Sequence, residues 1–196
     1  MNHPLISTQL GDINLDYQYA YTIPSSKAVL KQQPDDFIVK EQLSFLPEGS
    51  GTHAFLWIEK KSLNTLDVIN VLAKFADIEA KHIGYAGLKD KQAITSQWFS
   101  INLEGLTEPD WKQFSHINIT IKTVTYHRKK LKIGSITSNE FTILLRNIQP
   151  YQPDVIEQRL NQMIKYGIPN YFGPQRFGIN NQNITKAASW FAGKIK

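Results

Sequence analysis

The segment from Gly84 to Phe99 contains the residues best suited to chemistry in this sequence. Two glycines precede the triplet Lys89-Asp90-Lys91, and an apolar, aromatic run follows it. This order predicts a strand, a tight turn and a second strand, with the Asp90 carboxylate at the turn between two ammonium groups. Neighbouring positive charge favours the ionised form of a carboxylate. Asp90 is therefore a candidate nucleophile, a candidate metal ligand or a turn residue, and its own segment leaves these alternatives open.

Two further groupings could form a binding site. Asn139 and Phe141 are two residues apart in a predicted strand, so their side chains point to the same face. An amide that reads a base edge, beside a ring that stacks on a base, suits a nucleotide. Arg176 lies among aromatic residues in the segment 171–178, which suits a phosphate contact. Each grouping also has a structural alternative: a strand-entry asparagine with a core phenylalanine, and a loop that plugs the core.

Several other chemistries lack support in the sequence. The absence of cysteine excludes thiolate metal ligands, disulfides and cysteine nucleophiles. The five histidines are scattered without paired spacing, so we expect no metal site. The glycine motifs of phosphate loops, dinucleotide folds and serine hydrolases are absent. No apolar run approaches the roughly 20 residues of a membrane span, and residues 1–10 lack a signal-peptide pattern. We therefore expect a cytoplasmic protein.

The composition fits one domain that binds a polyanion. With 196 residues and 41% hydrophobic content, the chain has enough material for a packed core. The net charge is +5, and residues 122–146 contain six Lys or Arg against a single acid, Glu140. A local excess of this kind suits nucleic acid, and a solvated basic loop is an equally good interpretation.

The periodicity of apolar residues predicts an α+β fold with a mostly antiparallel sheet and helices packed on one side. Strands are predicted over 28–43, 53–60, 83–86, 93–102, 117–126 and 140–148. The last is apolar on both faces, which favours a central position. Helices are predicted after an N-cap at Asn64 or Thr65, over 107–114, from Pro153 to Gly167 with a buried apolar stripe, and from Gln182.

Four separated segments together resemble the TruD family of tRNA pseudouridine synthases. The first holds Lys31, Pro34, Asp36, Phe37, Val39 and Glu41; the second runs from Gly84 to Trp98; the third is Asn139 with Phe141; the fourth runs from Asn170 to Gly178.

The resemblance implies an isomerase that needs no cofactor and converts uridine at position thirteen of tRNA to pseudouridine. Asp90 would be the nucleophile, acting on a flipped-out nucleotide. Lys31 would be its basic partner, and the substrate contacts would be Phe37, Asn139, Phe141 and Arg176.

Members of this family are longer than 196 residues. We therefore expect residues 1–196 to be the N-terminal part of the catalytic domain, without the family's inserted domain and the closing segment of the sheet. Two alternatives follow from this expectation. The chain could be an RNA-binding remnant without activity, or a fragment that does not fold alone.

Overall fold

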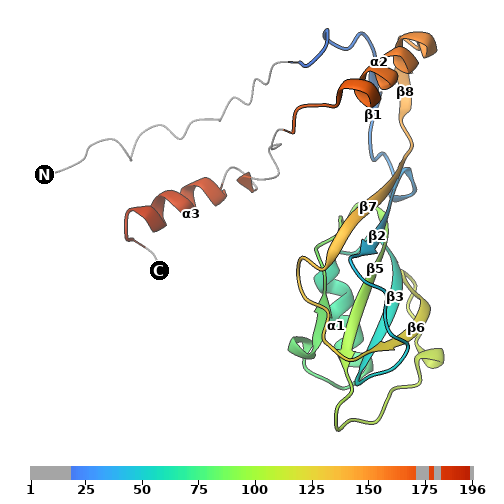
Figure 1. The fold of residues 1–196 in the computed structure, drawn as a ribbon, viewed down its shortest axis with the longest axis vertical. Coiled ribbons are helices and arrows are strands. Elements are labelled where there is room, and N and C mark those ends of the chain that lie inside the picture. The colour runs from blue at the N-terminus through green and yellow to red at the C-terminus, as the bar shows by residue number, and fades with distance from the viewer. Residues whose placement is uncertain (1–18, 171–176, 179–181, 195–196) are drawn as a thin grey trace, which may run out of the picture. The chain divides into compact units, whose positions relative to one another are not determined.

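A computed structural model describes residues 19–170, 177–178 and 182–194 (Figure 1). The chain divides into two compact units. The sheet unit comprises residues 27–149, and the helical unit comprises the described parts of 1–26 and 150–196. None of the helices in these described parts is long and apolar enough to cross a membrane.

The sheet unit contains a mixed, mostly antiparallel sheet of six strands. Its strands are β2 (Phe37–Leu43), β3 (His53–Lys61), β4 (Ile83–Tyr85), β5 (Ile94–Asn102), β6 (Ile119–His127) and β7 (Ile136–Ile143). The order is β6-β3-β5-β2-β7, with β4 beside β5, and only β2 and β5 pair in parallel. A separate antiparallel ribbon joins β1 (Lys27–Val29) to β8 (Arg146–Gln149). The predicted α+β class with a mostly antiparallel sheet is confirmed.

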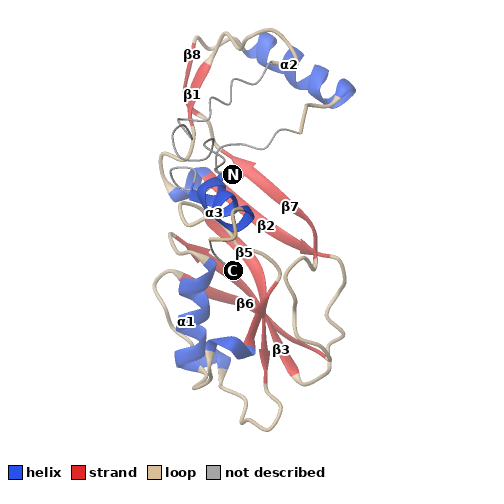
Figure 2. Ribbon diagram, turned by 90° about the vertical axis from the view of Figure 1, so that its left-hand side faces the viewer, coloured by secondary structure: helices blue, strands red, loops and turns tan. Residues whose placement is uncertain are grey.

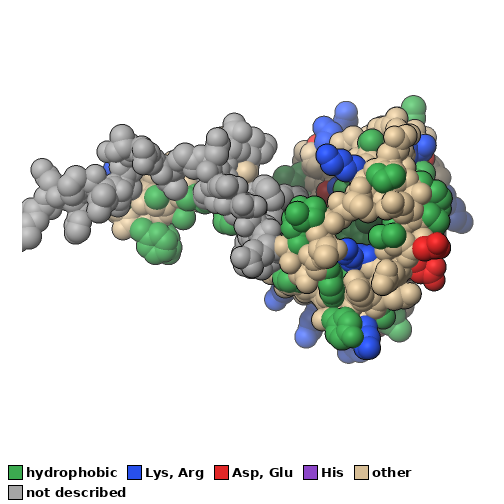
Figure 3. Space-filling model, turned by 90° about the horizontal axis from the view of Figure 1, so that it is seen from above, with side chains coloured by type: hydrophobic (Ala, Val, Ile, Leu, Met, Phe, Trp, Pro, Cys, Tyr) green, Lys and Arg blue, Asp and Glu red, His purple; other side chains and the backbone are tan. Residues whose placement is uncertain are grey.

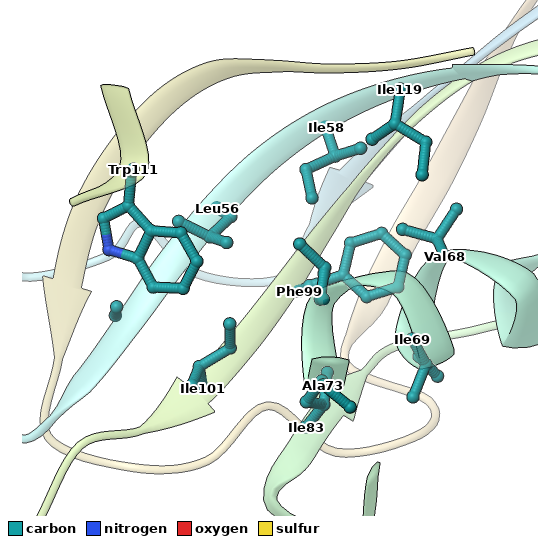
Figure 4. Close-up of a cluster of buried hydrophobic side chains, with 12 residues drawn as sticks. Leu56, Ile58, Val68, Ile69, Ala73, Ile83, Phe99, Ile101, Trp111 and Ile119 are labelled. Carbon is teal, nitrogen blue, oxygen red and sulfur yellow. The ribbon is translucent and has the colours of Figure 1, made fainter. Parts of the chain in front are cut away.

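Helix α1 (Thr65–Phe75) lies along one face of this sheet (Figure 2). It begins as predicted at Asn64, whose side chain accepts the Asp67 N–H while the Asp67 carboxylate accepts the Asn64 N–H. Its apolar side chains face those of β3 and β5 in the main core (Figure 4), which includes Leu56, Ile58, Val68, Ile69, Leu72, Phe99 and Ile101. Burying each large apolar side chain contributes about 1.5–3 kcal/mol, so this face stabilises the unit.

Two predictions in the sheet unit are wrong. The apolar run 140–148 is not a central strand: β7 ends at Ile143, pairs only with β2 among the described strands, and leaves Phe141 53% exposed. The sequence predicted burial on both faces because the apolar residues of this run do not alternate with polar ones. The predicted helix 107–114 is only the 3-10 turn η3 (Trp111–Gln113), which Asp110 caps by accepting the Lys112 N–H.

The helical unit contains α2 (Pro153–Tyr166) and α3 (Gln182–Phe191). Helix α2 begins at Pro153 and is terminated by Gly167, which has a φ of 76°. Residues other than glycine rarely adopt this conformation. Both predicted ends are therefore confirmed. Its apolar stripe was predicted to be buried, and this is wrong: Leu160 is 53% and Ile164 82% exposed. Figure 3, a view from above, shows apolar side chains at the surface.

Candidate active site

Asp90 lies in the connection from β4 to β5, residues 86–93, which we call the Asp90 loop. Lys31 Nζ donates a hydrogen bond of 3.0 Å to Asp90 Oδ1. The Asp90 side chain is 38% exposed and that of Lys31 is 25% exposed. The Asp90 carboxyl group is paired with an ammonium group, partly shielded from water and still accessible, which are properties a nucleophile needs.

Lys31 has an unusual backbone conformation and is held in place by two contacts. Its backbone has a φ of 54°, a left-handed conformation that is uncommon outside glycine. Its carbonyl accepts a 3.0 Å hydrogen bond from Gln92 Nε2 in the Asp90 loop. Its ammonium group lies 3.7 Å from the centroid of the Phe37 ring, within the range of a cation–π interaction. The loop and Lys31 therefore position each other.

Phe37, Phe141 and Asn139 lie on the same face of the β2–β7 pair as this contact. The Phe37 and Phe141 rings meet edge to face with centroids 5.8 Å apart. In the pairing of β2 with β7, Asn139 lies opposite Glu41, two residues from Phe141. Its Oδ1 is buried and has no hydrogen-bond partner among the described residues. Such an atom is rare in folded proteins, and an incoming hydrogen-bond donor would satisfy it.

The two lysines beside Asp90 do not surround its carboxylate as the sequence predicted. Lys89 points away from Asp90, and its Nζ lies 2.8 Å from Glu41 Oε2 in a pair whose side chains are 5% and 0% exposed. Lys91 is exposed. Within the described ranges, the ammonium group that pairs with the Asp90 carboxylate belongs to Lys31, from a distant part of the chain.

Three buried polar side chains that sequence reasoning missed hold the backbone of the Asp90 loop. Thr65 Oγ1 accepts the Lys89 N–H at 2.9 Å and donates to Gln97 Oε1 at 2.9 Å. Gln97 Nε2 donates to the Gly87 carbonyl at 3.0 Å, and Lys60 Nζ donates to the Asp90 carbonyl at 2.8 Å. For Lys60 and Gln97 the available signal was a polar residue on the inward face of an otherwise apolar strand.

The start of β2 is fixed by an ion pair between the buried Asp36 and the partly exposed Arg146. Arg146 donates to both oxygens of the Asp36 carboxylate, from Nε at 2.8 Å and from Nη2 at 2.7 Å. These hydrogen bonds, with that from the Gln33 N–H, hold the pKa of Asp36 below its ordinary value of 3.8. The backbone is therefore fixed immediately before Phe37.

Other sequence predictions have different outcomes. Arg176 lies outside the described residues; of its segment, only Asn170, Phe177 and Gly178 are described. Among the described residues no group of His, Asp or Glu is arranged to hold a metal ion. Three members of the basic stretch 122–146 are in ion pairs, namely Lys122 with Glu59, Arg128 with Glu48, and Arg146 with Asp36. That leaves Lys129, Lys130 and Lys132 as the cluster of positive charge.

Residues 13–190 match the family model of tRNA pseudouridine synthase D (TruD), and the chain belongs to this family. The predicted class, an isomerase family acting in tRNA modification, is thereby confirmed at the level of the family. The sequence is 41% identical over 182 residues to tRNA pseudouridine synthase D of Mannheimia succiniciproducens and 42% identical to that of Haemophilus influenzae. Both alignments cover 93% of this chain and 53% of the relative. The chain thus spans about half the length of the curated relatives it matches.

The fold agrees with this assignment. A crystal structure of a Methanosarcina mazei protein assigned to TruD superposes on the chain with a TM-score of 0.72 at 29% identity. The superposition covers 83% of this chain and 38% of that chain.

Proposed function

We propose that this chain carries the catalytic aspartate of a tRNA pseudouridine synthase that isomerises uridine at position 13 of tRNA without a cofactor. The observation that carries the proposal is the 3.0 Å contact between Lys31 and Asp90, beside the Phe37 ring. Membership of the TruD family supports the tRNA substrate.

In this proposal the target nucleotide leaves the helical stack and enters the space between Asp90 and the β2–β7 face. The Phe141 ring, which is 53% exposed, is available to stack on a base. The unpartnered Asn139 Oδ1 is an acceptor for an N–H of uracil. Together these contacts would retain the free base while it turns.

The Asp90 carboxylate would attack the nucleoside, either at the sugar C1′ or at the uracil ring. The bond from N1 to C1′ then breaks, the uracil turns, and C5 bonds to C1′. C5 loses its proton, N1 gains one, and the carboxylate is regenerated, so the reaction is an isomerisation that consumes nothing. Lys31 would keep Asp90 ionised before attack and compensate its charge when it leaves the adduct.

The test is release of tritium from tRNA labelled at uridine C5, measured for Asp90→Asn, Asp90→Ala and the wild type. We expect both variants to release none while binding tRNA with a Kd within about twofold of the wild type, since Asp90 contributes little to binding. Asp35→Asn is the matched control, because Asp35 is exposed and pairs with Lys61. Tritium release by Asp90→Ala would show that another group is the nucleophile.

A second candidate function is RNA binding without turnover. It is favoured by the chain's 53% coverage of its relatives and by the cluster Lys129, Lys130 and Lys132 in the basic stretch. In that case tRNA binding would weaken steeply with salt, and Lys129→Gln with Lys132→Gln would lower the salt dependence. Measurable pseudouridine formation by the 196-residue chain would exclude this alternative.

A further inference from the structure

Lys60 is a buried lysine without an ion-pair partner in the described part of the chain. It lies on β3 with 1% of its surface exposed. Its Nζ donates to the Leu63 carbonyl at 2.6 Å and to the Asp90 carbonyl at 2.8 Å. Burying an ammonium group without a salt bridge is costly, so a residue with this placement calls for an explanation beyond packing.

The two hydrogen bonds of Lys60 join two separate segments, which are also linked by a 3.2 Å hydrogen bond from the Ser62 N–H to the Ala93 carbonyl. Leu63 belongs to the turn between β3 and α1, whereas Asp90 belongs to the loop between β4 and β5. Thr65, at the start of α1, holds the Lys89 N–H. Lys60 therefore holds the peptide group that follows the Asp90 side chain, and Thr65 holds the N–H of the preceding residue. Both contacts restrict the direction in which the carboxylate points.

We propose that Lys60 is the positioning residue of Asp90: its ammonium group fixes the Asp90 main chain to the β3–α1 turn and places a second positive charge, after Lys31, near the carboxylate. The inference rests on the proposed role of Asp90 as the nucleophile. It assigns Lys60 no contact with substrate.

The charges around Lys60 agree with this role. The pKa of Lys60 is lowered to about 8, mainly by burial. The positive charge of Lys89 also lowers this pKa, whereas the carboxylates of Asp90 and of Asp67 on α1 raise it. At neutral pH the group is therefore mainly an ammonium ion. The Lys60 ammonium group is thus close enough to the Asp90 carboxylate for the two charges to attract each other.

The first experiment compares Lys60→Met with Lys61→Met, its neighbour, which is exposed and pairs with Asp35. We expect Lys60→Met to lower kcat about 10- to 100-fold with little change in KM for tRNA, because a charged hydrogen bond is lost at a group acting in the transition state. Lys61→Met should retain wild-type kcat. Equal kcat in the two variants, or a loss confined to KM, would overturn the proposal.

The absence of cysteine permits a sharper version. Lys60→Cys introduces a unique thiol, and alkylating it with 2-bromoethylamine in the unfolded chain before refolding restores an ammonium group on a side chain of nearly lysine length. This group has a lower intrinsic pKa than lysine. We expect alkylation to recover kcat. We also expect kcat to fall with rising pH as the Lys60 ammonium group loses its proton, and this fall should lie at lower pH in the alkylated variant. Recovered activity with an unmoved pH profile would mean that only packing matters.

A third measurement does not depend on turnover and so separates failure of this inference from failure of the proposed function. NMR of the Lys60 side chain gives its pKa in the wild type and in Asp90→Asn. We expect a lower pKa in Asp90→Asn because the attracting carboxylate is gone. The amides of residues 89–91 should exchange about tenfold faster in Lys60→Met than in Lys61→Met, as expected for loss of one charged hydrogen bond. An unchanged pKa, or unchanged exchange in a folded Lys60→Met, would refute the positioning role even in an inactive chain.

Discussion

The buried pair of Glu41 and Lys89 gives the sharpest stability prediction. The two side chains are 0% and 5% exposed, and their charged atoms are 2.8 Å apart. Glu41→Gln keeps the shape of the side chain, and the amide oxygen can still accept the Trp98 N–H, which the wild-type Oε1 accepts at 3.1 Å. The substitution therefore removes the charge, places an amide NH2 group where Oε2 contacted Lys89, and leaves the Lys89 ammonium buried and unpaired. Breaking a buried pair in this way costs about 3–5 kcal/mol.

For a unit the size of residues 27–149 this loss corresponds to a fall in Tm of roughly 10–20 °C. The assay is urea and thermal unfolding followed by circular dichroism. The matched control is Glu140→Gln, which breaks the pair of Lys40 on β2 with Glu140 on β7. That pair is 3.8 Å apart and about half exposed. We expect the control to lose at most about 1 kcal/mol.

The double variant Glu41→Gln/Lys89→Met removes both charges and should be more stable than Glu41→Gln alone, because no unpaired charge is left buried. If Glu41→Gln unfolds at the same urea concentration as Glu140→Gln, the pair does not stabilise the Asp90 loop as argued. The same conclusion would follow if the double variant were no more stable than the single one.

Two further predictions concern the frame around the site. Arg146 lowers the pKa of Asp36 in the folded state. The contribution of Asp36 to stability is therefore complete above pH 3.8 and is lost as the pH falls through the folded-state pKa. Between pH 6 and pH 2.5, the measured Tm should fall less steeply in Asp36→Asn than in the wild type. Gly84→Ala should lower the Tm of the sheet unit, because an added Cβ would clash with the Leu131 carbonyl and Ser100 Oγ. Gly87→Ala is the control and should be tolerated, because the atom nearest to an added Cβ there is 3.5 Å away.

Local signals in the sequence predicted the parts of the fold that local chemistry determines. Asn64 with Asp67, Pro153 and Gly167 each satisfy or terminate helix ends within a few residues, and the helices begin and end there. Charge at the site was not predictable in this way. Lys89 is adjacent to Asp90 in sequence but pairs with Glu41, whereas Asp90 pairs with the distant Lys31.

Burial was the property that the sequence predicted least well. The run 140–148 and the stripe of α2 are apolar, and an apolar pattern indicates a preference for burial without indicating what covers it. In the described structure Phe141 and Leu160 remain 53% exposed. Conversely, Lys60 and Gln97 are fully buried although their types favour the surface. Only the tertiary contacts with the Asp90 loop explain these two residues.

The single parallel pair in the sheet has a consequence for how the site forms during folding. Joining β2 to β5 in parallel requires the chain to pass through β3, α1 and β4 first, and the Lys31–Asp90 contact closes a separation of 59 residues. Contacts over such distances form slowly, because the entropy of the intervening chain must be lost before they are gained. We expect Asp90 to acquire its cation late, together with the last strand pairing. Recovery of the site during refolding should therefore report completion of the whole sheet.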